Sequence, residues 1–168
     1  REAISASGKS VVVIGGGDTG NDCVETALAQ GAKSVVQLEI LPEDKVANDP
    51  MHDEQTAAGA DRRWQVQAKE FRGAEQLTAV GATEVQWAPV HGGRNEPVAV
   101  PGGDFLVPAD LALLAVGFKR TFDPDLAEQF GLTTDDDGGV HVERCQTSAD
   151  GVFADGDGIA FPLHVNLR

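Results

Sequence analysis

The sequence predicts an α/β protein in which a parallel sheet is covered on both faces and an antiparallel β-meander is added to it. Ser10 to Ile14 contains four β-branched residues in a row, and Leu111 to Val116 is continuously apolar. Neither run alternates between apolar and polar residues, which is typical of strands buried on both faces. A glycine-rich turn and a helical pattern follow the first run. Together these observations favour a three-layer α/β domain.

Length and charge limit the classes of function. The chain has 168 residues, 41% of them apolar, which is enough for one globular domain with a buried core. Its formal net charge of −14 repels nucleic acid and anionic lipid, so neither is an expected partner. No apolar stretch reaches 18 residues, and Arg1 to Ser10 lacks the apolar block of a secretory signal. We therefore expect no membrane association and a cytoplasmic location.

The first part of the chain predicts one βαβ unit. After the strand over Ser10 to Ile14, the spacing predicts a helix over Asp18 to Gln30, with Gly31 at its C-terminal cap. A second β-rich run extends over Ser34 to Leu41. Strand, helix and strand in this order give parallel strands joined by a right-handed crossover.

The signal weakens after this unit. Between Pro42 and Asp61 we expect no more than one short helix, because prolines and a glycine interrupt a polar stretch. Short runs bounded by glycines then predict an antiparallel meander, with strands at Trp64 to Phe71, Ala82 to Ala88, Pro97 to Val100 and Asp104 to Val107. Beyond the apolar run that starts at Leu111, a helical turn is predicted at Pro124 to Phe130 and a strand at Gly139 to Glu143.

The turn after the first strand has the pattern GxGxxG, formed by Gly15, Gly17 and Gly20. In a dinucleotide-binding turn, the first glycine allows the tight bend and the second lets the pyrophosphate approach the backbone. The third lets the helix pack close to the strand. The N-terminus of the following helix favours the negative charge of a phosphate. The pattern predicts a Rossmann-like nucleotide-binding domain, and an S-adenosylmethionine site or a turn without ligand remain alternatives.

An acidic residue follows the second strand at the position that a dinucleotide site requires. Glu39 lies 19 residues after Gly20, where a carboxylate accepts hydrogen bonds from the adenosine ribose. A carboxylate about 4 Å from a 2′-phosphate is repelled by roughly 1 to 4 kcal/mol. Lys45 is the nearest cation in the sequence that follows, and two acidic residues precede it. These residues favour NADH over NADPH without deciding between them.

The cysteines and histidines provide no metal or disulfide motif. Cys23 and Cys145 are too far apart to form a CxxC pair, which excludes a disulfide reductase of the thioredoxin-reductase kind. The four histidines show no metal-ligand spacing. We assign no catalytic residue and no metal site.

With these motifs in place, the chain resembles the small (beta) subunit of glutamate synthase and its relatives, which have the glutathione-reductase-type fold. The resemblance depends on four blocks in the same order: VVVIGGGDTGNDCVETALAQGAKSV, QLEILP, ADLALLAVGF and QTSADGVFADGD. In that family an NAD(P) domain is inserted into an FAD domain. The resemblance implies an NAD(P)-binding domain over residues 8–120 and a partial FAD-binding segment over residues 121–168.

The resemblance also implies roles for individual residues. The turn would contact the NAD(P) pyrophosphate and Glu39 the ribose, while Gly117 would lie at a strand end near the cofactor. Asp157 would hold a ribityl hydroxyl of FAD, with Gly156 beside it. The residues assigned to the pyrophosphate are Gly15, Gly16, Gly17, Asp18, Thr19 and Gly20.

The function implied by this resemblance is transfer of hydride from NAD(P)H to FAD. Electrons would then pass to the glutamate synthase large subunit, so the expected partner is that subunit or the remaining FAD and iron–sulfur portion of the protein. The FAD adenine-binding motif and the cysteine-rich segment of the family are missing here, and Pro162 disfavours the family's next helix. The chain therefore resembles a fragment. The alternative is a nucleotide-binding or interaction fragment without turnover, because the FAD site is incomplete.

Overall fold

The computed structural model describes residues 4–46, 50–89, 95–117, 122–135, 138–154 and 159–160. The chain divides into two compact units, Arg1–Gly117 and Phe118–Arg168. Within the described ranges, no helix combines the length and the apolar character needed to cross a bilayer.

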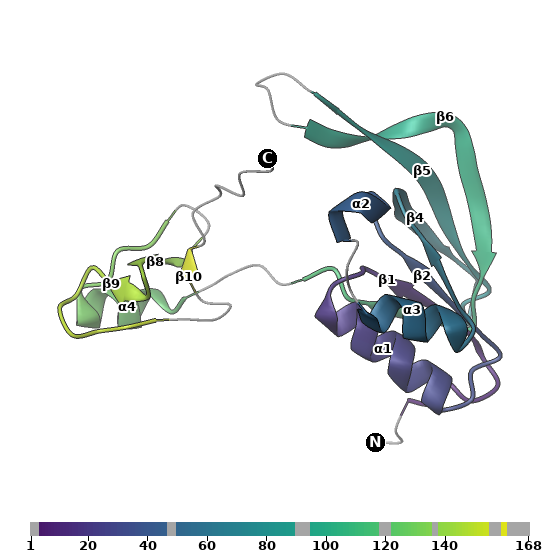
Figure 1. The fold of residues 1–168 in the computed structure, drawn as a ribbon, viewed down its shortest axis with the longest axis horizontal. Helices are drawn as coiled ribbons and strands as arrows, with labels where there is room; N and C mark the ends of the chain where they lie inside the picture. The colour runs from purple at the N-terminus through teal and green to yellow at the C-terminus, as the bar shows by residue number, and fades with distance from the viewer. Residues whose placement is uncertain are drawn as a thin grey trace. The chain divides into compact units, whose positions relative to one another are not determined.

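A four-stranded parallel sheet forms the centre of the first unit (Figure 1). Its strand order is β3-β2-β1-β7, so the chain starts in the middle of the sheet and adds strands first on one side and later on the other. Helices α1 and α3 lie side by side on one face, and the short helix α2 lies in the connection between β2 and β3. The bounds are β1 (Ser10–Ile14), α1 (Asp18–Ala29), β2 (Ser34–Leu38), α2 (Glu43–Val46), α3 (Pro50–Ala57), β3 (Ala60–Arg63) and β7 (Leu111–Leu114).

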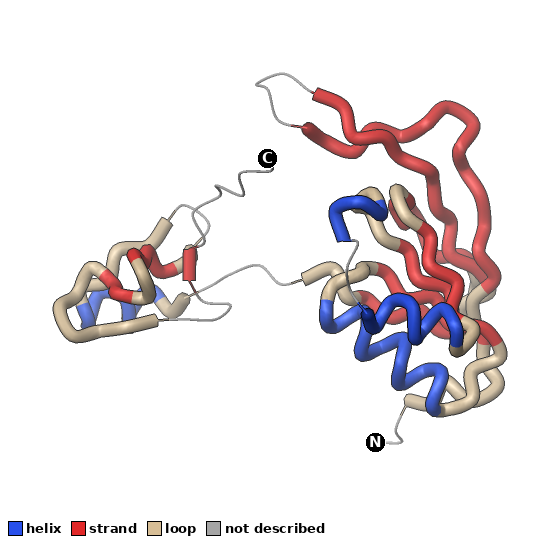
Figure 2. The backbone as a smooth tube through the Cα atoms, in the orientation of Figure 1, coloured by secondary structure: helices blue, strands red, loops and turns tan. Residues whose placement is uncertain are grey.

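An antiparallel sheet covers the opposite face of the parallel sheet (Figure 2). It consists of β4 (Val66–Arg72), β5 (Ala79–Pro89) and β6 (Asn95–Pro108). Val12 and Ile14 of β1 pack with buried residues of this sheet, whereas Val11 and Val13 pack with α1. This two-sided burial explains why the run is apolar without alternation. The predicted three-layer α/β fold with an antiparallel meander is confirmed, and its layers are helices, parallel sheet and antiparallel sheet.

Several element bounds differ from the prediction. Strand β3 was not predicted, and the polar stretch before it contains two short helices instead of one. The second strand ends at Leu38 instead of Leu41. The two runs predicted between Pro97 and Val107 form the single strand β6, which pairs with β5 alone. Prolines are tolerated in β6 because an edge strand has backbone N–H groups that need no ladder partner.

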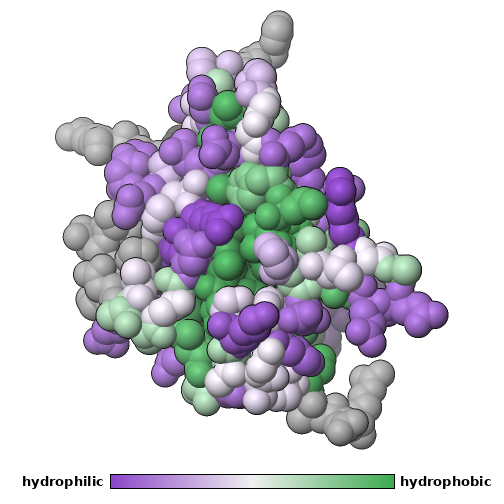
Figure 3. Space-filling view, turned by 90° about the vertical axis from the view of Figure 1, so that its right-hand side faces the viewer, coloured by the Kyte–Doolittle hydropathy of each residue, from purple (hydrophilic) through white to green (hydrophobic). Residues whose placement is uncertain are grey.

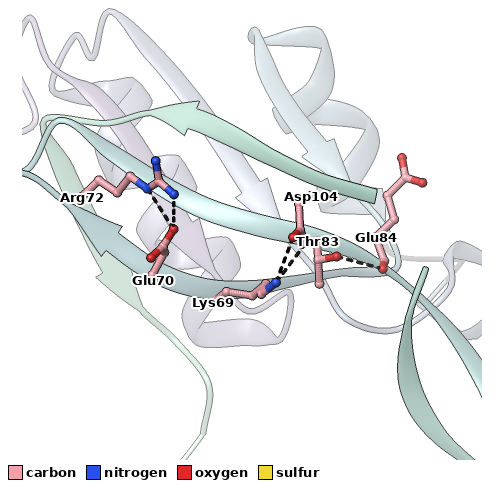
Figure 4. Close-up of polar contacts among 6 residues, drawn as sticks. All are labelled: Lys69, Glu70, Arg72, Thr83, Glu84 and Asp104. Atoms are coloured by element: carbon pink, nitrogen blue, oxygen red, sulfur yellow. Dashed lines mark hydrogen bonds and ion pairs between the residues drawn. The ribbon is translucent and has the colours of Figure 1, made fainter. Parts of the chain in front are cut away.

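The antiparallel sheet carries ion pairs on its strands (Figure 4). Lys69 Nζ lies 3.0 Å from Asp104 Oδ1, and Arg72 Nη2 lies 2.6 Å from Glu70 Oε1. The neighbouring Thr83 hydroxyl and the Lys69 ammonium hold the pKa of the Asp104 carboxyl below its usual range. The carboxylate is exposed, so its contribution to the stability of the fold is small.

The depressed pKa of Asp104 gives the first testable prediction. A carboxyl with a lowered folded-state pKa stabilises the fold above its unfolded pKa, and this contribution is lost as the pH falls through the folded value. We expect Asp104→Asn to lower the urea midpoint slightly at pH ~7 and by a smaller amount at pH ~3, because protonation of Asp104 progressively removes its stabilising charge as the pH falls below the ordinary pKa of a carboxyl. Glu75→Gln, in an exposed turn, is the control. A difference of the same size at both pH values would contradict the assignment.

The second unit contains α4 (Pro124–Phe130), β8 (Val140–Glu143), β9 (Gln146–Thr147) and β10 (Ile159–Ala160). The predicted bounds of α4 are confirmed, because its sequence carries signals at both ends. The Asp123 carboxylate caps the helix by accepting from the Asp125 N–H at 2.9 Å, Pro124 occupies the first turn, and Gly131 ends the helix with φ +64°. The predicted strand at Gly139 to Glu143 corresponds to β8, which starts one residue later.

The surface combines hydrophilic and apolar areas. On the face shown in Figure 3, a band of apolar side chains is framed by hydrophilic ones. Apolar residues are also exposed at the carboxyl end of β7 and just after it, where the exposed fractions of Leu114 and Val116 are 65% and 70%. Exposed apolar side chains that lie next to each other are typical of surfaces that contact another part of a protein.

Candidate functional site

The glycine turn lies at the carboxyl edge of the parallel sheet, where an α/β fold places its ligands. The chain leaves β1 toward β2 on one side, and β7 lies on the other side of β1, so the strand order reverses here. One cavity of about 400 Å³ lies at this edge. Its lining includes Gly15 to Gly17 after β1, Glu39 after β2, and Ala115 and Val116 after β7. With residues 66–68 of β4, which also line the cavity, the fold brings together four chain segments that are distant in the sequence.

Three glycines of the turn are required by the packing of the protein itself. Gly15 has φ +111°, and a Cβ there would collide with the carbonyl oxygen of Ala115. A Cβ on Gly16 would collide with the Glu39 carboxylate, and one on Gly20 with the carbonyl oxygen of Gly15. The close approach of α1 to β1 at Gly20 agrees with the packing role of the third glycine in the motif.

Gly17 is different, because nothing in the described fold requires a glycine there. It precedes α1 with φ −75° and ψ −176°, an extended conformation that any residue adopts. Apart from Gly17 itself and its two chain neighbours, no atom of the described residues lies within 4 Å of the position that its Cβ would occupy. Among the first unit's glycines with described surroundings, Gly17 alone combines open space with a φ outside the left-handed region. Gly17 leaves open space in front of the N-terminus of α1. As the N-cap residue it makes no side-chain hydrogen bond to the helix.

Glu39 is held in a fixed orientation beside the turn. It is 6% exposed, and its Oε1 accepts a hydrogen bond from the Leu41 N–H at 2.7 Å. The Glu39 N–H donates to the carbonyl oxygen of Arg63 at 2.8 Å, which joins it to the end of β3. The second carboxylate oxygen lies against Gly16. The negative charge of Glu39 is therefore fixed at the wall of the cavity.

The other site residues predicted from the sequence lie in different places. Asp18 and Thr19 are exposed in the first turn of α1, and Thr19 lines a separate groove between α1 and β7. Gly117 is exposed with φ +82° and follows Val116, a residue that lines the cavity. Gly156 and Asp157 lie outside the described residues. The ligand contacts assigned to all of these residues stay predictions.

Sequence reasoning missed two buried polar residues beneath the turn. Gln37 in β2 is 1% exposed and Asn21 in α1 is 3% exposed. The Gln37 Nε2 donates to the carbonyl oxygen of Gly15 at 2.9 Å. A glutamine within the apolar run of β2 was the available signal, because a buried amide needs a hydrogen-bond partner.

Comparison with protein families decides the assignment of the chain. The model described as pyridine nucleotide-disulphide oxidoreductase matches residues 1–166. The chain belongs to this family. The glycine turn and Glu39 therefore belong to a protein of an oxidoreductase family.

The relatives within the pyridine nucleotide-disulphide oxidoreductase family include glutamate synthases, which confirms the resemblance inferred from the motifs. The NADPH glutamate synthase small chain of Azospirillum brasilense is 36% identical over 162 residues, covering 92% of this chain and 33% of that protein. The NADH glutamate synthase of Schizosaccharomyces pombe is 33% identical over 177 residues, covering 92% of this chain and 8% of that protein. The chain spans about a third of the length of the small chain that it matches.

Solved structures of two reductases share the fold. The HOCl-induced flavoprotein disulfide reductase of Escherichia coli aligns with a TM-score of 0.59 at 19% identity, over 91% of this chain and 32% of that one. The covalent putidaredoxin reductase–putidaredoxin complex aligns with a TM-score of 0.59 at 25% identity, over 91% and 33% of the two chains. These alignments agree with the glutathione-reductase-type fold predicted from the sequence.

Proposed function

We propose that this chain is the pyridine-nucleotide-binding module of a flavoprotein oxidoreductase similar to the glutamate synthase small subunit, which passes hydride from NAD(P)H to FAD. The open space at Gly17 carries this proposal. The surrounding fold would accept a side chain at this position, so the glycine serves something that the protein atoms do not include. A pyrophosphate that approaches the N-terminus of α1 would use this space.

The cavity walls that follow β1, β2 and β7 each have a role in this proposal. The backbone from Gly15 to Gly17 and the first turn of α1 would bind the pyrophosphate, and Glu39 would accept hydrogen bonds from the adenosine ribose. The segment from Ala115 to Gly117 would lie beside the nicotinamide half. The bound dinucleotide supplies the hydride, while the chain binds and orients it. For FAD, we propose that Asp157 and Gly156 contribute part of the site.

NADH is the preferred dinucleotide in this proposal. The buried Glu39 carboxylate would repel a 2′-phosphate at the ribose, and its hydrogen bond to Leu41 keeps it in place. The names of the relatives include both dinucleotides, since the Schizosaccharomyces pombe protein is named for NADH and the Azospirillum brasilense protein for NADPH. The proposed preference for NADH therefore rests on Glu39 and not on the names of the relatives.

We propose as partner the remaining FAD and iron–sulfur portion of a longer protein, or the glutamate synthase large subunit. The chain spans about a third of the small chain that it matches, which supports the first of these. On its own, the sequence is proposed to bind nucleotide without turnover, because Gly156 and Asp157 supply only part of a flavin site. This is the alternative function, and the nucleotide site is common to both.

Titration with NADH tests the proposal. We expect the purified chain to quench or shift NADH fluorescence with a Kd between about 1 μM and 1 mM, the usual range for such ligands. We also expect no flavin absorbance, since we propose that Gly156 and Asp157 supply only part of a flavin site. S-adenosylmethionine is the control ligand and should not displace NADH. Absence of NADH binding, or displacement by S-adenosylmethionine, would contradict the proposed function.

A further inference from the structure

We propose that Gln37 is a positioning residue of the phosphate-binding turn, and this inference rests on the proposed function. Its buried carboxamide joins the first residue of the turn to the helix that follows. The Gln37 Nε2 lies 2.9 Å from the carbonyl oxygen of Gly15 and 3.4 Å from Asn21 Oδ1. Gly15 begins the turn and Asn21 follows its last glycine, so one side chain contacts both ends.

The hydrogen bond to Gly15 determines which way the turn presents its N–H groups. The described residues contain no cis peptide bond, and in a trans peptide the carbonyl and the following N–H point in opposite directions. The Gly15 carbonyl lies between Gln37 and Gly20 on the inner side of the turn. The N–H of Gly16 therefore points away from the Gln37 amide, and Gly16 is one of the residues that line the cavity. Gln37 thus orients an N–H donor toward the proposed pyrophosphate.

The Gln37 carboxamide is closely packed, so it has little freedom to move away from the turn. A Cβ on Gly20 would lie 3.0 Å from the Gln37 Nε2, so the amide already contacts the inner side of α1. Gln37 is 1% exposed, and its neighbours in β2 are Val36 and Leu38. Burial of an amide in an apolar strand is unfavourable unless its hydrogen bonds are made. The polar residue is therefore explained by the turn that it holds.

A wider network fixes Asn21, the second contact of Gln37. Arg62 Nη2 of β3 donates to Asn21 Oδ1 at 2.6 Å, and Gln55 Nε2 of α3 donates to the Asn21 carbonyl oxygen at 3.0 Å. Arg62 Nη2 also lies 3.2 Å from Gln55 Oε1. Side chains from β2, α1, α3 and β3 thus converge beneath the turn. A network of hydrogen bonds of this kind makes the local structure more rigid.

Replacement of Gln37 by an apolar residue of similar shape tests the inference. In Gln37→Met we expect the Kd for NADH and the Kd for ADP to rise by about tenfold each, a change of about 1.4 kcal/mol. The amides of Gly16 to Gly20 should also exchange hydrogen faster in the absence of ligand. Thr83→Val is the matched control, because it removes a buried hydroxyl from the antiparallel sheet, at 2% exposure. It should lower stability without changing either Kd.

The outcomes separate this inference from the proposed function. If the wild-type chain binds NADH and Gln37→Met binds it equally well, Gln37 is only a packing residue and the inference is overturned. If the wild-type chain binds neither NADH nor ADP, the proposed function fails and the inference with it. Should Gln37→Met not fold, Gln37→Leu provides the same comparison with a branched side chain. A loss of affinity in either variant, with Thr83→Val unchanged, supports the inference.

Discussion

A Gly17→Val variant is expected to fold nearly as stably as the wild-type chain and to lose NADH binding. The backbone at Gly17 is extended, and beyond its two chain neighbours no described residue has an atom within 4 Å of its Cβ position. A valine fits this conformation, so we expect the free energy of unfolding to stay within about 1 kcal/mol of the wild-type value. The same valine fills the space in front of α1 that the pyrophosphate needs.

The expected loss of NADH affinity is on the order of a hundredfold or more, which corresponds to about 2.7 kcal/mol. The valine would separate the phosphates from the backbone N–H groups and from the positive end of the helix. NADH fluorescence titration measures the affinity, and thermal unfolding measures the stability. Wild-type affinity in this variant would show that the open space does not receive the pyrophosphate.

Gly20→Ala is the comparison variant, because we expect it to lower the stability that Gly17→Val retains. Its Cβ would collide with the carbonyl oxygen of Gly15, on the inner side of the turn. We expect this overpacking to lower the free energy of unfolding by about 1–3 kcal/mol. Gly17→Val should lose NADH binding without losing stability, whereas Gly20→Ala should lose stability. This difference would distinguish the glycine that faces the ligand from the glycine that the packing requires.

The parts of the fold that the sequence predicted well are those with strong local signals. The bounds of β1 were predicted because four β-branched residues end at a glycine, and those of α4 because Asp123, Pro124 and Gly131 mark its ends. Strand β3 lacked such a signal, since Asp61 to Arg63 are polar. It becomes a strand by pairing with β2 at the edge of the sheet. Pairing of this kind depends on a distant segment, which local patterns do not show.

The candidate site was predictable to a similar extent. The spacing of Gly15, Gly17 and Gly20 predicted the position of the turn, and the fold places Glu39 beside it. The motif assigned Gly15 and Gly20 to the bend and the packing, and Gly17 to the pyrophosphate, but it did not show that the packing also restricts Gly16. It also did not reveal the network of Gln37, because its partners are 16 and 22 positions away on other elements. These features depend on how α1 lies against β1 and β2.

The wild-type chain is expected to bind NADH more tightly than NADPH. Glu39→Gln is expected to reduce the ratio of the Kd for NADPH to the Kd for NADH by about tenfold or more. A carboxylate about 4 Å from a 2′-phosphate is repelled by roughly 1 to 4 kcal/mol, depending on the local dielectric. Glutamine removes the charge and keeps an oxygen that can accept from the Leu41 N–H, so the segment after β2 should stay in place. Calorimetric titration of both dinucleotides measures the ratio of their Kd values.

Glu43→Gln is the matched control for Glu39→Gln. It makes the same chemical change four residues later, on the exposed helix α2 and outside the cavity lining. Screening by solvent and salt leaves an exposed carboxylate little influence on a phosphate at a distance, so the NADH preference should change by less than about twofold. Equal changes in both variants would indicate that overall negative charge sets the preference. A change confined to Glu39→Gln would instead locate the 2′ position of the ribose beside this one buried carboxylate.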